Sequence, residues 1–266
     1  MTWIVGVPSP FGHAILISDV CVTFRRQNQQ ALYVDCLQKI YPLTRFVLGG
    51  FSGSVQIGFK MLDQLSKRLN QSSPVDGSDI NIVANTWLPR MAKHIFRSFE
   101  NQERILGCSI ILAWVHPTRD RPALALPWSY VHILRSPEFI PTIAAEVGAL
   151  SIGCGSGVPQ YVKTVKEICQ SDEFLHWSFE RQKMDATFLS AVLRDRLENN
   201  PSPGISKFFQ MALVTRGPWS IAGNERLIVS PDGTETREQF PAIARSYREF
   251  LKMCESRRLT SRAAST

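Results

Sequence analysis

The chain has 266 residues, of which 44% are hydrophobic and 20% charged, so it has the composition of an ordinary globular protein with a substantial core. No stretch approaches the roughly 20 apolar residues of a transmembrane helix, and the first residues lack the pattern of a secretory signal. These features predict a cytoplasmic protein without a membrane partner. The net charge of +7 comes without a basic stripe interleaved with aromatic residues, which argues against a nucleic-acid partner.

The spacing of cysteines and histidines argues against two further classes of protein, zinc-binding proteins and disulfide-stabilised proteins. The six cysteines form no C-x-x-C pair, and the five histidines show no metal-ligand spacing. The pattern argues against a zinc site and a disulfide framework and predicts a reducing compartment. We therefore expect no metal and no cofactor.

The first fifty residues are predicted to be mostly sheet. Residues 2–7 form an apolar run, and residues 13–24, after the turn PSPFG, form a second run rich in β-branched residues, so the two predict a hairpin. Further strands are expected at residues 31–39 and 44–51, with YPLTR between them.

Helices and strands then alternate in groups. Apolar residues at helical spacing predict a helix over residues 55–69 and a second over 80–99, kinked at Pro89. The later strands are expected at SIILAWV, ALALPWS, YVHIL, GALSIG, FFQMALV and ERLIVS, and the later helices at residues 158–168 and 185–197 and at PAIARSYREFLKM.

This order predicts an α+β fold with two sheets covered by helices. We expect one domain over residues 1–256, followed by a basic, disordered tail over residues 257–266.

Two glycine-rich turns join strands to helices. In GFSGS the backbone N–H groups lie at a positive helix end, where they bind a phosphate, bind a developing oxyanion, or form a tight corner. The turn lacks the Gly-Lys-Ser/Thr ending of a Walker loop. IGCGSG is equally ambiguous, because a G-x-G-x-x-G motif would need glycine in place of Val158.

Two charged residues interrupt apolar segments. Asp19 follows HAILIS, and Lys39 ends ALYVDCLQK. Because charged residues are rarely buried unless they are paired, the two form either a buried ion pair or two surface charges. Their spacing fits both.

Four segments occur in a characteristic order: TWIVGV, SDVCVT, QKIYPLTRFVLGGFSGSV and SIGCGSG before a helix. In this order and spacing they resemble the proteasome β subunit family, which includes bacterial HslV and other bacterial proteasome homologues. The resemblance is dense through residues 2–69 and resumes at SIGCGSG, whereas residues 70–145 and roughly the last sixty residues match in pattern only.

The resemblance implies a four-layer αββα sandwich of the N-terminal-nucleophile hydrolase type and a threonine-type endopeptidase. Thr2 stands at the family's N-terminal nucleophile, and we expect removal of Met1 to expose its α-amino group as the base. The catalytic residues that it implies are Thr2, Asp19, Lys39, Gly53 and Cys154.

A substrate site is also implied. Thr23 would pair with the backbone of a peptide added as a strand. Val22, Tyr41, Phe51 and Val55 would line a pocket for a small or medium apolar side chain, although each of these four is also an ordinary core residue.

The sequence departs from the family at two places. The family's serine near the nucleophile falls on Cys154, with Ser156 as the second choice. Its late aspartate should fall in ENNPSPGISK, which offers Asn200, Ser202 and Gly204 but no aspartate.

The departures leave two alternatives to the peptidase: a ring-forming homologue with weak or no activity, and a small-molecule amidase on the same fold. As partners, the resemblance implies an unfolded-protein or peptide substrate and a homo-oligomeric double ring. The sequence contains no ATP site, so energy-dependent degradation would need a regulatory ATPase as a partner chain.

Overall fold

The computed structural model describes residues 2–9, 12–24, 30–71, 77–116, 129–145, 148–169, 182–199, 202, 204–215, 220–222, 225–229, 234–257, 259 and 263–265. The described residues form a mixed α/β fold in which every pairing between named strands is antiparallel. No described helix has the length and apolar character needed to cross a membrane.

Two large sheets make up the centre of the molecule. The five-stranded sheet has the order β10 (Leu150–Gly153), β1 (Trp3–Pro8), β2 (His13–Asp19), β11 (Phe209–Thr215), β12 (Ser220–Ala222). The eight-stranded sheet has the order β4 (Leu32–Asp35), β3 (Cys21–Phe24), β15 (Ala263–Ser265), β6 (Val47–Ser54), β7 (Cys108–Val115), β8 (Ser129–Arg135), β9 (Thr142–Ala145), with β5 (Ile40–Thr44) also paired to β6. A separate hairpin consists of β13 (Glu225–Val229) and β14 (Glu235–Gln239).

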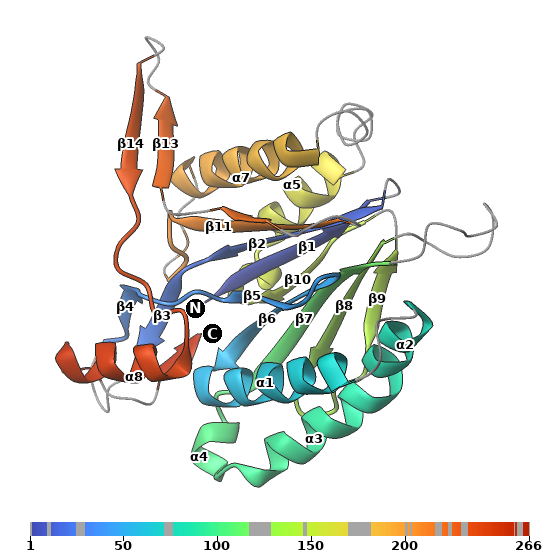
Figure 1. Cartoon of the computed structure of the whole chain (residues 1–266). Coiled ribbons are helices and arrows are strands. Elements are labelled where there is room, and N and C mark those ends of the chain that lie inside the picture. Colours follow the sequence, from blue (N-terminus) through green and yellow to red (C-terminus); the bar gives the residue numbers. More distant parts are fainter. Residues whose placement is uncertain are drawn as a thin grey trace.

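Helices cover the outer faces of the two sheets (Figure 1). On the side of the five-stranded sheet lie α5 (Pro159–Cys169) and α7 (Gln182–Asn199). On the side of the eight-stranded sheet lie α1 (Val55–Gln71), α2 (Gly77–Ile82), a π-helical turn (Val83–Trp87) and α3 (Leu88–Ser98). The remaining helices are α4 (Asn101–Arg104), a 3₁₀ turn (Cys154–Gly157) and α8 (Tyr247–Ser256).

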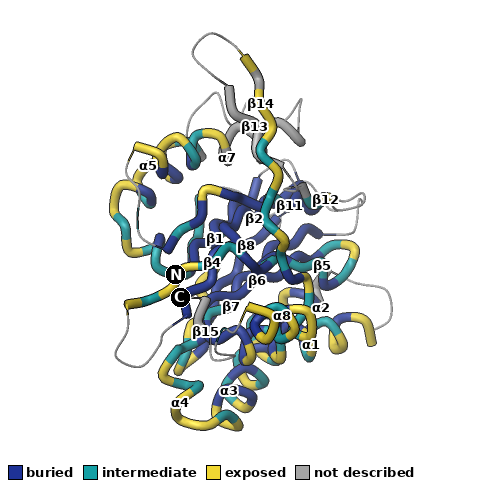
Figure 2. The backbone as a smooth tube through the Cα atoms, turned by 90° about the vertical axis from the view of Figure 1, so that its left-hand side faces the viewer, coloured by how far each residue is buried: buried dark blue, intermediate teal, exposed yellow. Residues whose placement is uncertain are grey.

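The core explains why the first strands are apolar on both faces. Ile4 and Leu16 pack between the two sheets, whereas Trp3 and Val5 pack beneath α5 and α7. All six residues of β1 are therefore buried, and the strand shows no polar alternation. Figure 2 shows these buried strands inside a shell of more exposed helices.

The predicted hairpin of residues 2–24 is correct only in its first half. β1 and β2 pair, but the apolar run that continues through residue 24 changes sheets at Val20, so that β3 belongs to the eight-stranded sheet. The Val20 carbonyl accepts hydrogen bonds from the N–H groups of Cys36 and Leu37. Because this crossing depends on pairing with a distant segment, the pattern of apolar residues does not reveal it.

Other predicted elements differ locally. YPLTR, expected between strands, lies largely in β5, and the helix expected over residues 80–99 contains a π-helical turn directly before Leu88 and Pro89. The helix expected from residue 241 begins at Tyr247, because the Ser246 hydroxyl caps the N–H of Glu249. ALALPWS lies outside the described residues except for Ser129.

The tail also differs from its prediction. Residues 263–265, expected to be disordered, form β15 between β3 and β6. Ala263 and Ala264 pair with β3, and Ala264 and Ser265 pair with β6, which a composition of small and polar residues does not predict.

A buried histidine gives the fold a pH-dependent stability. His132 has no exposed surface, and its Nδ1 accepts a hydrogen bond from Trp114 Nε1 at 3.1 Å. Its Nε2 lies 3.4 Å from the Asn85 amide nitrogen. Burial lowers the pKa of His132 from 6.5 to about 4, so the ring is neutral in the folded protein at neutral pH.

We predict that His132→Gln will flatten the acid limb of the stability profile. Between pH 6.5 and about 4 the histidine binds a proton in the unfolded chain but not in the folded protein. As the pH decreases through this range, the free energy of unfolding therefore falls by up to about 1.4 kcal/mol per pH unit. Denaturant unfolding at several pH values measures the slope. The exposed His94→Gln is the control and should keep the wild-type slope; equal slopes in all three proteins would contradict the prediction.

Candidate active site

A buried ion pair lies where the two sheets meet. Lys39 Nζ is 2.9 Å from Asp19 Oδ1, and neither side chain has exposed surface. Asp19 ends β2, and Lys39 directly precedes β5. Of the two arrangements that the sequence allows for these residues, the structure contains the buried pair.

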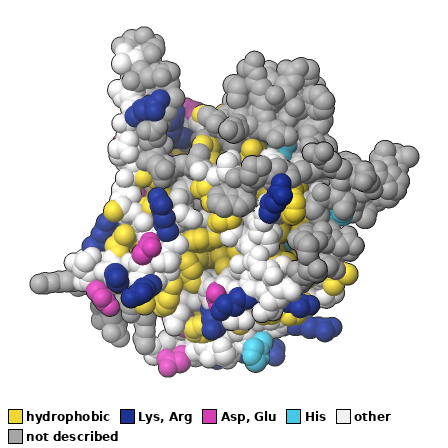
Figure 3. Space-filling model, viewed as in Figure 1, with side chains coloured by type: hydrophobic (Ala, Val, Ile, Leu, Met, Phe, Trp, Pro, Cys, Tyr) yellow, Lys and Arg dark blue, Asp and Glu magenta, His cyan; other side chains and the backbone are white. Residues whose placement is uncertain are grey.

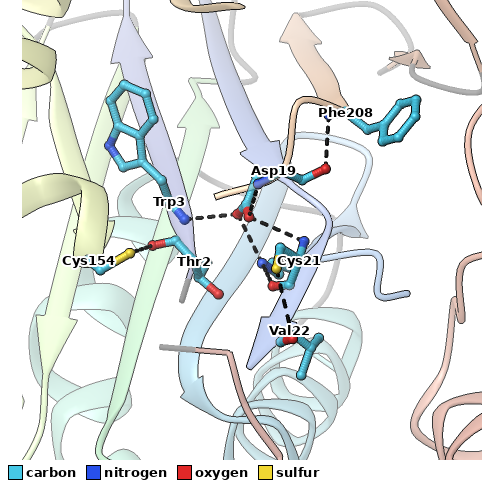
Figure 4. Close-up of polar contacts among 9 residues, drawn as sticks. Thr2, Trp3, Asp19, Cys21, Val22, Cys154 and Phe208 are labelled. Atoms are coloured by element: carbon cyan, nitrogen blue, oxygen red, sulfur yellow. Dashed lines mark hydrogen bonds and ion pairs between the residues drawn. The ribbon is translucent and has the colours of Figure 1, made fainter. Parts of the chain in front are cut away.

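The Asp19 carboxylate also accepts three backbone hydrogen bonds. Oδ1 accepts from Trp3 N at 2.9 Å, and Oδ2 accepts from Cys21 N at 3.2 Å and from Ser206 N at 3.3 Å. Figure 4 shows these contacts converging on the carboxylate. One side chain thereby connects β1, β3, the segment before β11 and Lys39.

The Lys39 ammonium donates to Asp19 and to the Cys21 carbonyl oxygen. An ammonium has three N–H groups, and among the described residues these two oxygens are its acceptors. One N–H group is therefore available for a ligand or a reacting group.

Thr2 lies directly before β1 and beside this network. Its residue has no exposed surface, and its Oγ1 has no hydrogen-bond partner among the described residues. Leaving a buried hydroxyl without a partner costs about 1–3 kcal/mol, and such groups in native structures call for an explanation, which is often functional. The hydrogen bond from the neighbouring Trp3 N–H to Asp19 sets the position of Thr2 relative to the ion pair.

Cys154 contacts Thr2 from the other side. Its Sγ donates to the Thr2 carbonyl oxygen at 3.4 Å, and Figure 4 shows Thr2 between Cys154 and the Asp19 network. Ser156, the second choice from the sequence, instead donates to the Gly153 carbonyl oxygen. Burial raises the pKa of the Cys154 thiol to about 11, so the sulfur is a neutral donor at physiological pH.

The turn predicted at GFSGS is wrong, because these residues lie within β6, which stays paired with β7 as far as Gly53 and runs directly into α1, whereas Gly153 ends β10 beside Thr2 before the 3₁₀ turn. Both positions require glycine. Gly53 has φ +93, and a Cβ there would come within 2.4 Å of the Gly107 carbonyl oxygen. Gly153 has φ +88, and its Cβ would lie 2.0 Å from the Thr2 carbonyl oxygen. No other residue fits at Gly153 unless Thr2 moves.

The predicted pocket residues are packed in the core. Val22, Phe51 and Val55 are buried in one cluster, and Tyr41 packs against it with its ring 6.3 Å from that of Phe51. Thr23 lies in β3, where it pairs with Tyr33 of β4 on one side and with β15 on the other. The four apolar residues therefore adopt the core role that the sequence left open.

Sequence reasoning missed several groups that complete the site. The backbone donors of Trp3 and Ser206 and the carbonyl of Cys21 carry no side-chain signal. Asp35 of β4 is a second carboxyl group whose charge interacts with that of Asp19. Burial raises the pKa of Asp35, and repulsion from Asp19 adds to the shift. Its register opposite Cys21, set by strand pairing, is what brings it there.

Within the described part of the chain, no three His, Cys, Asp or Glu side chains come together to hold a metal ion. The chain matches no family model and no curated protein. Its chemistry must therefore be inferred from the geometry of the site.

A double-mutant cycle will measure how Asp19 and Lys39 depend on each other. We predict that Lys39→Met lowers the free energy of unfolding by about 3–5 kcal/mol, because it leaves a buried carboxylate without its cation. The double variant Asp19→Asn/Lys39→Met should lose less free energy of unfolding than Lys39→Met alone, since neither charge of the pair remains buried. Denaturant unfolding is the measurement.

Lys67→Met is the matched control, because Lys67 and Asp63 form an exposed pair with 60% and 50% of their side-chain surfaces accessible. We expect Lys67→Met to change the free energy of unfolding little, because exposed ion pairs contribute little to stability. A Lys39→Met protein as stable as Lys67→Met would show that the buried pair does not act as a unit.

Proposed function

We propose that this protein is a threonine-type endopeptidase of the N-terminal-nucleophile class, with Thr2 as the nucleophile after removal of Met1. In this proposal the two sheets and their covering helices are the four-layer αββα sandwich of that class. The observation that carries the proposal is the buried Lys39–Asp19 pair, whose carboxylate also binds the backbone N–H next to Thr2.

The chemistry begins with activation of Thr2. A threonine hydroxyl is a poor nucleophile and needs a base within hydrogen-bond reach. The α-amino group of an exposed Thr2 serves as that base, since the pKa of such a group is about 7.7–8.0. The positive charge of Lys39 favours negative charge on the Thr2 oxygen, and Asp19 holds that ammonium in place.

Peptide hydrolysis then follows in two steps. The Thr2 oxygen attacks the substrate carbonyl carbon while its proton passes to the amine, and the Gly53 N–H stabilises the oxyanion, a contact worth about 3–4 kcal/mol. The amine gives the proton to the leaving nitrogen as the C–N bond breaks, which leaves an ester on Thr2. Water, activated by the same amine, hydrolyses the ester and restores Thr2.

Cys154 supports this mechanism as a positioning residue. Its thiol donates to the Thr2 carbonyl oxygen, and a thiol with a pKa of about 11 does not compete as a nucleophile at neutral pH. The resemblance assigns this position to the family's serine, and the Cys154 thiol keeps a hydrogen-bond donor there.

We also propose that the chain works in the cytoplasm as a homo-oligomeric double ring, with an ATPase partner for folded substrates. Exposed apolar side chains support an assembly: Ile82 of α2 is 56% exposed, and Ile105, directly after α4, is 71% exposed. Figure 3 shows further hydrophobic side chains in the middle of one face, bordered by Lys and Arg.

The alternative with the strongest support is a ring-forming homologue with weak or no peptidase activity. It is favoured by the lack of an aspartate in ENNPSPGISK and by the complete burial of Thr2 in this structure. A small-molecule amidase on the same fold is the third candidate.

The proposal predicts that a peptide epoxyketone will form an adduct on Thr2 in a protein that also hydrolyses peptides. Peptide mapping by mass spectrometry locates the adduct, and Thr2→Ala is the negative control. An adduct without peptide turnover would favour the amidase. Absence of an adduct in folded protein would favour the scaffold.

The Asp19→Asn/Lys39→Met protein separates catalysis from folding in the same assay. It keeps the site free of unpaired charge but lacks the ammonium, so we expect near-zero labelling. Lys39→Arg should not restore labelling, because a planar guanidinium does not replace a compact ammonium at a tight site. Full labelling of either variant would remove Lys39 from the mechanism.

A further inference from the structure

The last described strand lies in a slot one strand wide. β15 is antiparallel to β3 on one side and to β6 on the other. Ala264 is opposite both Thr23 and Ser54, and Ser265 is opposite Gly53. β3 and β6 therefore meet only through β15 at this point of the sheet.

The width of the slot defines what it binds. Neighbouring strands lie about 4.8 Å apart, so β3 and β6 are separated by about twice that distance across β15. Without β15, two strand edges with unpaired N–H and C=O groups would face each other. Such a gap accepts one extended peptide, whose main chain pairs on both sides.

Both walls of the slot belong to the candidate active site. Cys21 at the start of β3 binds Asp19 through its N–H and Lys39 through its carbonyl. Gly53 in β6 is the proposed oxyanion donor and is paired with Ser265. In Figures 1 and 2 the two marked chain ends lie next to each other, so β15 ends close to the start of β1.

The side chains around the slot fit a small ligand residue. The partners of Ala264 on the two walls, Thr23 and Ser54, are short hydroxyl residues and are buried. Thr23 Oγ1 has no hydrogen-bond partner among the described residues. The segment whose backbone is paired in the slot is Ala-Ala-Ser, so we expect a ligand segment of small residues to be accepted there.

The connection to the rest of the chain favours binding within the molecule. Leu259 packs against the large core cluster, and its N–H donates to the Cys254 carbonyl oxygen at 2.8 Å. The chain is thus anchored at residue 259, only a few residues before β15. A short connection of this kind gives a millimolar effective concentration, which an incoming peptide must overcome.

We propose that residues 263–265 are an intramolecular ligand of the slot between β3 and β6, which closes the path to Thr2 until a peptide displaces them. The burial of Thr2 agrees with a closed site. The effect on hydrolysis rests on the function proposed above, whereas the binding of an extended small-residue segment in the slot does not.

The binding test uses the full chain with Thr2→Ala, so that no catalysis is involved. Ala264→Pro removes a backbone N–H from the ladder and should release β15, whereas Ala264→Ser at the same position keeps it. A fluorescein-labelled TSRAAST peptide is titrated and followed by fluorescence anisotropy. We expect the Pro variant to bind it about tenfold or more tightly than the Ser variant, which corresponds to about 1.4 kcal/mol or more. Equal affinity, or no binding to a folded Pro variant, would overturn the proposal.

The hydrolysis test uses the same substitutions with Thr2 intact and a fluorogenic peptide. We expect kcat/KM to rise about tenfold for Ala264→Pro and to stay unchanged for Ala264→Ser. Equal rates in active proteins would overturn the gating role. Peptide binding without hydrolysis in any variant would contradict the peptidase function and leave the slot proposal standing. Ala263→Pro serves as the second release variant if Ala264→Pro does not fold.

Discussion

The ion pair between Asp19 and Lys39 is the interaction on which the site depends. Removing two charges from water costs several kcal/mol per ion, and an apolar pair of similar volume would often be as stable. The pair is therefore a poor device for stability alone. The pair instead fixes the relative positions of backbone segments. The Asp19 carboxylate accepts hydrogen bonds from the N–H groups of Trp3, Cys21 and Ser206, and so joins both sheets at the point where Thr2 precedes β1.

Around this pair, the backbone supplies most of the site. Gly53, within β6, and Gly153, at the end of β10, have positive φ angles, and a Cβ at either position would collide with a neighbouring carbonyl. Glycine at position 153 lets the end of β10 pack directly against Thr2. Thr2 keeps a buried hydroxyl without a partner among the described residues, while its carbonyl is held by Cys154. This hydroxyl is the group that the proposed function takes as the nucleophile.

Local signals predicted the parts of the structure that depend on neighbours in the sequence. The strand from Trp3, the helix from Val55 and the turn after Gly153 follow from periodicity and turn chemistry, whereas GFSGS, predicted as a turn, lies within β6. The sequence also marked Asp19 and Lys39 as unusual, but it left open whether they pair, because their contact joins segments 20 residues apart. The crossing at Val20 and the position of Asp35 depend on strand register, which composition and spacing do not encode.

β15 shows the same limit most clearly. Its small and polar residues carry no strand signal, and the slot that it fills exists only after β3 and β6 have taken their places in the sheet. Conversely, the sequence is consistent with either a pocket or a core for four apolar residues, and the structure packs them together: Val22, Tyr41, Phe51 and Val55. An apolar pattern shows that these side chains avoid water, but tertiary packing decides whether they line a pocket or fill the core.

If the α-amino group of Thr2 is the catalytic base, hydrolysis requires Thr2 to be the first residue of the chain. The chain is produced with a cleavable leader whose removal leaves Thr2 as the first residue, and peptide hydrolysis is measured before and after cleavage on the same sample. We expect hydrolysis only after cleavage, since a peptide nitrogen cannot accept the proton. Equal hydrolysis before and after leader removal would contradict it.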